Sequence, residues 1–489
     1  MRFLARFISL PVVLFAAACS APATPASAPN DSAVVARVTA GLRPDVVVKN
    51  AAPVGYSLAD RMAHFKVPGV SIAVVDSGRI VWAHGYGLKE VGTTDSVTPT
   101  TIFQAASISK PVTATAMLHL VDEGKLALDT PVNDYLKSWK LPDNRFTAKE
   151  KVTLRRLASH SAGLTVHGFP GYAVTDSIPT VQQVLDGAKP ANTDAVRVDT
   201  TPGSIFRYSG GGTTIEQLVM TDVTGEPFPA LMKRLVLDPI GMTNSGYDQP
   251  LPNEERGREA VGYRNDGTMI VGRWHIYPEM APAGLWTTPT DLLKWAMEVT
   301  AAKAGKSQKV LSQKAATDML TMQKEPVGIG PMLHNSGRSF YFEHGGANEG
   351  YRAQVMYFPE LGQGAAVMTN SDAGSALAQE ILYSIAAEYK WPGYAPREVE
   401  TVAVDSAALK AFAGTYVTTN GLNANVQVTH EGGKLFIEDS KYISHSQLLM
   451  LGGDSVVAAE NGMEGKFGRN ARGVVDRLEL AGLVLKRTK

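Results

Sequence analysis

The chain has 489 residues, too many for one ordinary hydrophobic core, which predicts two or more domains. Hydrophobic residues make up 44% and charged residues 19%, which indicates a folded globular protein and excludes an intrinsically disordered one. The 47 basic residues equal the 47 acidic residues, so the charge gives no reason to expect nucleic acid as a partner. The composition does not exclude a small-molecule or peptide substrate.

The first residues are typical of a bacterial export signal. Arg2 and Arg6 precede a short apolar run over residues 7–15, which is too short to cross a bilayer as a helix. Small residues then lead into Cys19, the only cysteine of the chain, which excludes an internal disulfide. This position resembles a lipoprotein box, which implies that Cys19 is acylated and that the protein is periplasmic and anchored to a membrane by lipid. The alternative is soluble secretion after cleavage near this point.

Composition also marks the boundaries between segments. The Ala-, Pro- and Ser-rich stretch after Cys19 predicts a flexible tether, and Trp391-Pro-Gly-Tyr-Ala-Pro396 is typical of a domain boundary. We therefore expect a signal peptide over 1–18, the tether over 19–50, a main domain over 51–393 and a smaller domain over 394–489.

The main domain opens with a helix signal and a hairpin signal. Residues 58–65 have helical spacing. Residues 69–75 and 79–84 are apolar and rich in β-branched side chains, and the turn residues Asp76-Ser-Gly78 lie between them. This pattern predicts two antiparallel strands joined by a tight turn.

The clearest helix follows a stretch of small and polar residues. It starts near Pro111, runs to Val121 and ends at Gly124, in keeping with the preference for proline at helix starts and glycine after helix ends. Ser107 is therefore expected at or just before the N-terminus of a buried helix, with Lys110 one turn further on.

Helical and strand-like segments are mixed in the rest of the main domain. Strands at both ends of this region and helices between them favour an α+β fold, with an antiparallel sheet flanked by helices. The helical patterns cover 213–223, 289–300 and 375–389, and the strand-like runs cover 351–358 and 364–368.

Short alternating segments replace the long helices in the smaller domain. Turns separate them at intervals of about ten residues, which predicts a small all-β barrel or sandwich. The segments are 414–417, 425–429, 434–437, 447–450 and 474–480.

Ser107-Ile-Ser-Lys110 is the first motif that could carry chemistry. Residues three apart share one face of a helix, so the Ser107 hydroxyl and the Lys110 amine can meet. A serine hydroxyl becomes a useful nucleophile when a nearby base takes its proton. On its own, this pair is a weak signal that recurs by chance.

Two further motifs follow. Tyr208 precedes the glycine-rich run 209–212 and is either a packed loop aromatic or a second hydroxyl near Ser107 that exchanges a proton with the leaving group. Glu343-His-Gly-Gly-Ala347 lies just before the expected strand at 351–358. Its glycines let a substrate approach the backbone, where a free N–H can polarise a carbonyl. Taken alone, a plain turn with a surface histidine explains this motif better.

Together, the three motifs resemble the β-lactamase-related serine hydrolase family, which includes class C β-lactamases, D-alanyl-D-alanine carboxypeptidases, D-aminopeptidases and esterases. The resemblance covers about residues 56–389 and implies a penicillin-binding-type fold with an all-helical lobe. The segment from Leu409 through Phe412-Ala-Gly-Thr-Tyr416 resembles the lipocalin-like β-barrel often appended to this family. Further matching landmarks are Leu157-Ala-Ser-His-Ser-Ala-Gly-Leu164, Pro282-Ala-Gly-Leu-Trp-Thr-Thr288 and Gly345-Gly-Ala-Asn-Glu-Gly-Tyr351.

By position, the resemblance implies an acyl-enzyme mechanism with Ser107 as nucleophile, Lys110 as base and Tyr208 as acid and base. It also implies an oxyanion hole made by the backbone N–H groups of Ser107 and Ala347. The substrate-binding residues that it implies are His344, Gly345 and Gly346.

Two departures from the lactamase pattern affect the expected substrate. Gly210 stands where lactamases have an asparagine, and His344 and Gly345 stand where they have a lysine and a hydroxyl residue. Both departures argue against efficient β-lactam hydrolysis and leave acylation intact. Peptide, amide or ester substrates are therefore favoured, with weak β-lactamase activity at most.

Two other functions stay open. One is a non-catalytic, penicillin-binding-like lipoprotein that recognises cell-wall peptides, and the other is a structural lipoprotein whose barrel is the functional part. We expect neither a metal nor a cofactor, because no zinc-protease motif or cysteine–histidine cluster occurs. His160 is expected to be structural. The sequence does not determine the substrate or the oligomeric state.

Overall fold

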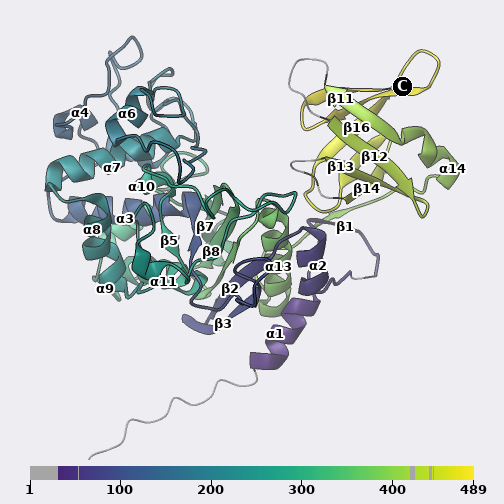
Figure 1. Ribbon diagram of the computed structural model, residues 1–489, viewed down its shortest axis with the longest axis horizontal. Helices are drawn as coiled ribbons and strands as arrows, with labels where there is room; N and C mark the ends of the chain where they lie inside the picture. Colours follow the sequence, from purple (N-terminus) through teal and green to yellow (C-terminus); the bar gives the residue numbers. More distant parts are fainter. Residues whose placement is uncertain (1–30, 53, 419–424, 440–442, 444, 489) are drawn as a thin grey trace, which may run out of the picture.

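The computed structural model describes residues 31–52, 54–418, 425–439, 443 and 445–488. The expected signal peptide and Cys19 therefore lie outside the described residues. In this part of the chain, no helix has both the length and the apolar character that a membrane span requires. Figure 1 shows a larger body of helices around a sheet, and a β-barrel at the C-terminal end.

A six-stranded antiparallel sheet forms the centre of the larger body, in the order β3-β2-β9-β8-β7-β6. The expected hairpin is β2 and β3, and the N-terminal β2 also pairs with β9, where Val70 lies opposite Thr369. This arrangement confirms the predicted α+β class. The strands are β2 (Gly69–Asp76), β3 (Arg79–Gly87), β6 (Met332–His334), β7 (Tyr341–Asn348), β8 (Tyr351–Phe358) and β9 (Gln363–Thr369).

Helices cover both faces of the sheet. Successive strand residues point to opposite faces, so Val70, Ile72 and Val74 of β2 join one core while Ala73 and Val75 join the other. The first core packs under α1, α2 and α13, and the second lies under α11 and the helical lobe. The bounds are α1 (Asp31–Ala40), α2 (Leu58–His64), α11 (Pro289–Lys303) and α13 (Gly374–Tyr389).

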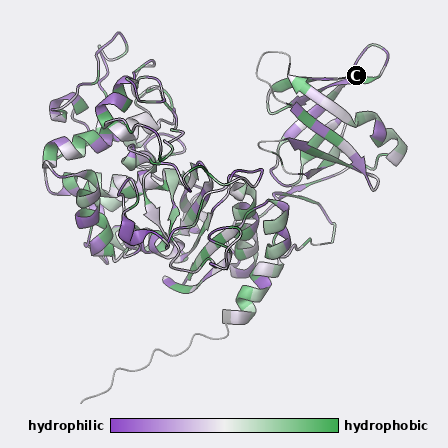
Figure 2. Cartoon of the chain, viewed as in Figure 1, coloured by the Kyte–Doolittle hydropathy of each residue, from purple (hydrophilic) through white to green (hydrophobic). Residues whose placement is uncertain are grey.

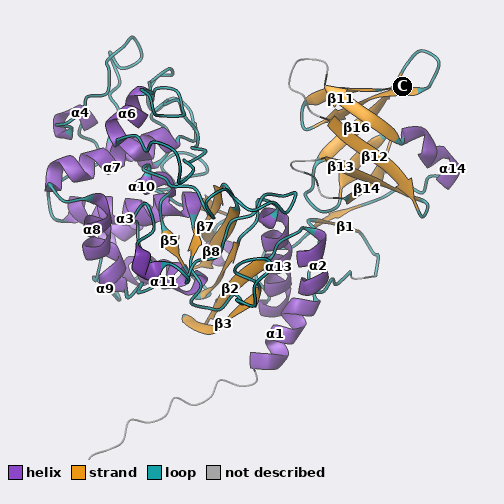
Figure 3. Ribbon diagram, viewed as in Figure 1, coloured by secondary structure: helices purple, strands orange, loops and turns teal. Residues whose placement is uncertain are grey.

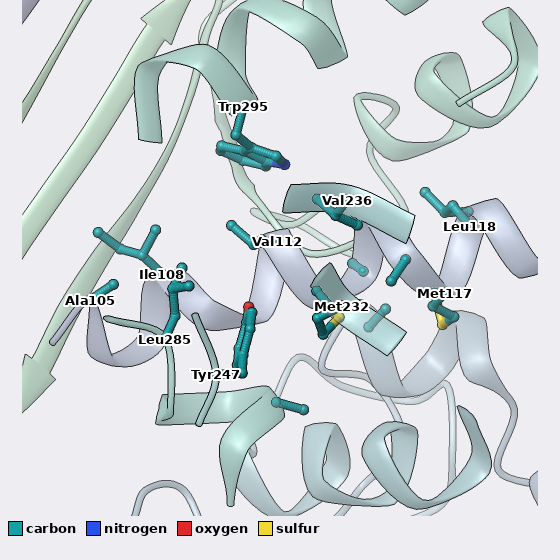
Figure 4. Close-up of a cluster of buried hydrophobic side chains, with 14 of the residues drawn as sticks. Ala105, Ile108, Val112, Met117, Leu118, Met232, Val236, Tyr247, Leu285 and Trp295 are labelled. Atoms are coloured by element: carbon teal, nitrogen blue, oxygen red, sulfur yellow. The ribbon is translucent and has the colours of Figure 1, made fainter. Parts of the chain in front are cut away.

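The helical lobe is built around α3, whose side chains are buried on nearly every side. A helix that is apolar all round belongs in a protein interior. In Figure 4, Val112 and Met117 of α3 lie among side chains from other segments, including Met232, Val236 and Trp295. The lobe and its surroundings contain α3 (Ser109–Asp122), α4 (Val132–Tyr135), α5 (Leu154–Ala158), α6 (Val181–Asp186), α7 (Gly210–Thr224), α8 (Phe228–Met232), α9 (Asp238–Ile240), α10 (Met280–Ala283) and α12 (Gln313–Met319), with the short strands β4 (Phe103–Gln104) and β5 (Trp286–Thr287).

The C-terminal part is a closed eight-stranded antiparallel barrel, as predicted (Figure 3). Buried and exposed residues alternate along the first half of β12, and Figure 2 shows both hydrophobic and hydrophilic colours on the barrel strands. The strands are β11 (Gly414–Thr418), β12 (Asn425–Glu431), β13 (Lys434–Asp439), β14 (Ser446–Gly452), β15 (Ser455–Ala458), β16 (Glu464–Arg469), β17 (Val475–Leu480) and β18 (Leu483–Arg487).

The barrel contacts the preceding part of the chain in several places. Strand β1 (Val46–Val48) pairs in parallel with β10 (Arg397–Val399), and Val46 packs against Leu449 of the barrel. Residues 31–50 thus contain α1 and β1, although we expected them to belong to a flexible tether. A cluster of ionisable side chains forms a second contact. Nη2 of Arg61 lies 2.6 Å from a carboxylate oxygen of Glu380 in α13 and 2.6 Å from one of Glu460 in the barrel, and His64 Nε2 lies 2.9 Å from the same Glu460 oxygen.

Candidate active site

Ser107 lies in a single 3-10 turn, η1 (Ala106–Ile108), that runs directly into α3. Because Ser107 stands just before α3, it lies at the positive end of the helix dipole. Lys110 Nζ donates hydrogen bonds to Ser107 Oγ at 2.9 Å and to the Pro282 carbonyl at 3.0 Å. Lys110 is buried, and these two partners hold its amine against the serine hydroxyl.

The backbone around Ser107 is held in an unusual conformation. Ala106 has a φ of 50°, in the left-handed region that residues with a side chain seldom adopt. Ser109 stabilises it, since its Oγ donates to the Ala106 carbonyl at 2.5 Å and accepts from the Leu285 N–H at 3.0 Å. The turn that carries the expected nucleophile is therefore fixed from two sides.

Tyr208 lies just before α7 and next to the same lysine. The centroid of its ring is 4.9 Å from Lys110 Nζ. The neighbouring Ser209 caps α7 by accepting the Gly212 N–H at 3.0 Å, and its hydroxyl donates to the Thr165 carbonyl at 2.8 Å. This cap explains why α7 begins at Gly210, three residues before the predicted start. The structure thus brings Ser107, Lys110 and Tyr208 together.

The third motif lies within β7 rather than before a strand. His344 and Gly346 point inward and Ala347 is exposed, because side chains alternate along a strand. A Cβ on Gly346 would fall 2.2 Å from the Ala105 carbonyl, so only glycine lets β7 come this close to η1. Strand β6 pairs with β7 only over Tyr341–Glu343, so the rest of that edge has no strand partner among the described residues. The oxyanion hole at Ser107 and Ala347 stays a prediction.

His344 is a neutral imidazole that presents a lone pair. Its Nδ1 lies 2.6 Å from the Gly345 carbonyl, which can only accept, so Nδ1 carries the proton. Burial, reinforced by the charge of Lys110, lowers the pKa of His344 to about 4. Its Nε2 is buried and has no hydrogen-bond partner among the described residues. That atom is therefore an unused hydrogen-bond acceptor.

Two more buried groups near Lys110 are uncharged at neutral pH. Burial, with smaller contributions from Lys110 and His344, holds the pKa of His160 well below its usual value. Burial also raises the pKa of Glu216 in α7 to about 8, although Lys110 opposes that shift. Sequence reasoning did not single out Glu216; a carboxylate between Ile215 and the apolar residues 218–220 was the available signal. Within the described residues, no group of three or more His, Cys, Asp or Glu could hold a metal ion.

Comparison with known proteins gives the family. The beta-lactamase family model matches residues 57–390, which include all three motifs. The chain belongs to the beta-lactamase family.

Individual members of the family are distant. Protein flp of Staphylococcus aureus strain N315 is 28% identical over 236 residues, which cover 47% of this chain and 44% of flp. A D-aminopeptidase from Brucella anthropi is 25% identical over 328 residues, which cover 64% of this chain and 58% of the aminopeptidase. The chain therefore spans about half the length of the curated relatives it matches.

A solved structure extends the likeness into the barrel. The octameric penicillin-binding protein homologue from Pyrococcus abyssi has a TM-score of 0.60 and 24% identity, and the match covers 88% of this chain and 98% of that one. At this identity the likeness shows the fold alone. It supports the combination of a beta-lactamase-family body with a C-terminal barrel.

The departure from the lactamase pattern at Gly210 has a structural counterpart. A Cβ there would lie 3.0 Å from a ring carbon of Phe169 and 3.2 Å from the His167 carbonyl. The loop that contains these two residues thus occupies the space into which an asparagine would extend. The site lacks the amide expected in a lactamase, and a side chain at this position would require the neighbouring loop to shift.

Proposed function

We propose that this protein hydrolyses amide or ester bonds through an acyl-enzyme formed on Ser107. The observation that carries the proposal is the 2.9 Å contact between Lys110 Nζ and Ser107 Oγ beside the Tyr208 ring. A nucleophile needs a base within hydrogen-bond reach and a third group that orients the base. Here the Pro282 carbonyl orients Lys110.

Acylation begins when Ser107 Oγ attacks the substrate carbonyl and its proton passes to the amine of Lys110. The carbonyl oxygen becomes an oxyanion, which the N–H groups of Ser107 and Ala347 would stabilise. Removal of one such donor typically costs about 100- to 1000-fold in turnover. The turn η1 keeps the Ser107 N–H in place before the charge develops.

The leaving group departs when the bond between the carbonyl carbon and its nitrogen or oxygen breaks. Tyr208 supplies the proton that this atom needs, and the proton is restored from Lys110. In deacylation, water attacks the ester on Ser107 and gives its proton to Tyr208 or Lys110, and Ser107 Oγ recovers a proton as it leaves. No charge or atom remains on the enzyme at the end of the cycle.

The polarity of the site supports amine- or amide-bearing substrates over carboxylate-bearing ones. His344 Nε2 is an acceptor, which attracts an N–H group and repels a carboxylate. The likeness to a D-aminopeptidase agrees with this preference. We therefore propose aminoacyl amides, peptides with a free amino group, or the corresponding esters as substrates, and at most weak activity on β-lactams.

The test is intact mass spectrometry after incubation with a fluorophosphonate, and separately with p-nitrophenyl acetate, on wild type and Ser107→Ala. We expect one adduct and ester turnover for wild type and neither for the variant. Wild type that forms an adduct without turnover would support the penicillin-binding-like alternative. A folded wild type without any adduct would disprove a catalytic Ser107.

A further inference from the structure

His160 accepts hydrogen bonds from the residues on both sides of Tyr208. Its carbonyl accepts the Arg207 N–H at 2.7 Å, and its Nδ1 accepts the Ser209 N–H at 3.2 Å. The imidazole lies against the Tyr208 ring, with 4.2 Å between the centroids and 37° between the planes. Phe206 approaches the same imidazole edge-on at 6.1 Å. The position of Tyr208 thus depends on His160 through its backbone and its ring.

The contact with Ser209 also fixes which nitrogen of His160 carries the proton. A backbone N–H can only donate, so Nδ1 is unprotonated and the neutral ring carries its proton on Nε2. This Nε2–H is buried and has no hydrogen-bond partner among the described residues. His160 and His344 therefore offer opposite polarities next to Tyr208: a free donor on one and a free acceptor on the other.

Two features of His160 are costly for a residue that only packs. A buried donor without a partner destabilises the folded state. The φ of His160 is 52°, in the left-handed region that a non-glycine residue adopts only at a cost. Unsatisfied polar groups and unusual backbone conformations tend to persist where function requires them.

We propose that His160 is a positioning residue that acts through Tyr208, holding the phenol at the leaving group and keeping an uncharged N–H donor beside it. When the C–N bond of an amide breaks, the Tyr208 proton moves to the leaving nitrogen and negative charge develops on the phenol oxygen. The Nε2–H of His160 is the donor that this charge attracts. A neutral imidazole provides it without adding a cation next to Lys110. The inference rests on the proposed hydrolase function.

Two substitutions separate the donor from the structural contact. His160→Asn places Oδ1 where Nδ1 stands, so the Ser209 N–H keeps an acceptor, and asparagine tolerates the left-handed backbone. It lacks a counterpart of Nε2–H. His160→Gln has a longer side chain, whose amide N–H can reach the Nε2 position. If His160 is purely structural, His160→Asn should be the more active variant. If His160 acts as we infer, His160→Gln should be the more active one.

The readout is the turnover of two substrates that share one aminoacyl group, a p-nitrophenyl ester and a p-nitroanilide. Nitrophenolate leaves without a proton, but the anilide nitrogen needs one from Tyr208. For His160→Asn we expect kcat on the anilide to fall at least about tenfold more than kcat on the ester, with KM for both within about twofold of wild type. His160→Gln should recover part of that loss.

Several outcomes would overturn the inference. They are equal losses on ester and anilide, an asparagine variant as active as wild type, and failure of both variants to fold, as judged by thermal melting.

In a Tyr208→Phe background, His160→Asn should leave the ester-to-anilide ratio unchanged, because the two residues act as a unit. Wild type is first labelled with fluorophosphonate. A failure at that stage contradicts the proposed function itself, whereas labelled wild type with insensitive variants contradicts only the role of His160.

Discussion

At the scale of single residues, the site surrounds Lys110 with buried groups that stay neutral. Lys110 is surrounded by two imidazoles and a carboxyl group whose pKa values are shifted by burial toward the uncharged form. A buried charge interacts strongly with its neighbours because the local dielectric constant is low. His160, His344 and Glu216 therefore add no further charge beside Lys110.

Glu216 makes this arrangement testable through stability. Its folded-state pKa of about 8 lies above the ordinary value of 4.5, so the folded protein holds a proton that the unfolded chain releases between these pH values. The stabilising contribution is complete below pH 4.5 and is lost as pH rises to about 8, at most about 5 kcal/mol. We expect the Tm of Glu216→Gln, relative to wild type, to rise by at least about 5 °C between pH 5 and pH 9.

The matched control for that measurement is Glu226→Gln. Glu226 is near the surface, and its hydrogen bond from Arg234 lowers its pKa, so this variant should gain nothing at high pH. A Tm difference between Glu216→Gln and wild type that does not change with pH would contradict the shifted pKa of Glu216.

At the scale of elements, the site is assembled where β7 meets η1. The closest approach is at Gly346, where a Cβ would meet the Ala105 backbone, which cannot move aside. At Gly345 a Cβ would instead meet the end of the Gln354 side chain at 2.9 Å, which can rotate away. A side chain at Gly346 is thus excluded by backbone, whereas one at Gly345 is opposed only by a side chain that can move.

Gly346→Ala should therefore separate β7 from η1. We expect the unfolding free energy to fall by about 1–3 kcal/mol, as is typical of overpacking. We also expect the rate of Ser107 labelling to fall at least about tenfold. Gly345→Ala, measured in the same way by denaturant unfolding, should lose about half as much stability or less. Equal losses for both variants would show that the contact with Ala105 is not the constraint.

Elements with a strong periodic pattern of apolar residues could be predicted from the sequence. Elements that depend on pairing with a distant strand, or that lack such a pattern, could not. The hairpin, α3, α11, α13 and β8 follow their sequence patterns closely. Strand β16 was missed because Gly465 and Gly468 interrupt a segment with no β-branched residue. The third motif was placed before a strand because its glycines suggested a turn, but pairing with β8 extends β7 through Asn348.

The candidate site could also be predicted only in part from the sequence. The sequence pattern selected Ser107, Lys110 and Tyr208, and the structure places Lys110 next to both of the others. The free atoms of His160 and His344 could not be read from sequence. They depend on which carbonyl or N–H each ring meets, and those partners are set by tertiary packing.

At the scale of the whole molecule, Arg61 links the larger body to the barrel. Its side chain is 8% exposed, and those of its partners Glu380 and Glu460 are 1% and 12% exposed. Removing one member of a buried ion network leaves the other charges without compensation, which costs about 3–5 kcal/mol. Arg61 contacts both Glu380 of the larger body and Glu460 of the barrel, so its loss should weaken the attachment of the barrel.

We expect Arg61→Met to lower the unfolding free energy by about 3–5 kcal/mol and to speed proteolytic cleavage in the segment 400–413, between β10 and β11. Arg37→Met is the control, because Arg37 pairs with Glu388 near the surface and such a pair contributes about 0–1 kcal/mol. The measurements are denaturant unfolding and limited proteolysis followed by mass spectrometry. Similar results for both variants would rule out Arg61 as the link.

The pairing of β1 with β10 has a consequence for synthesis on the ribosome. Val48 lies opposite Val399, roughly 350 residues later in the chain. At a synthesis rate of about 5–20 residues per second, β1 waits roughly 20 to 70 seconds before its partner strand exists. During that time this apolar strand has an unpaired edge, which favours binding by a chaperone until about four fifths of the chain has been made.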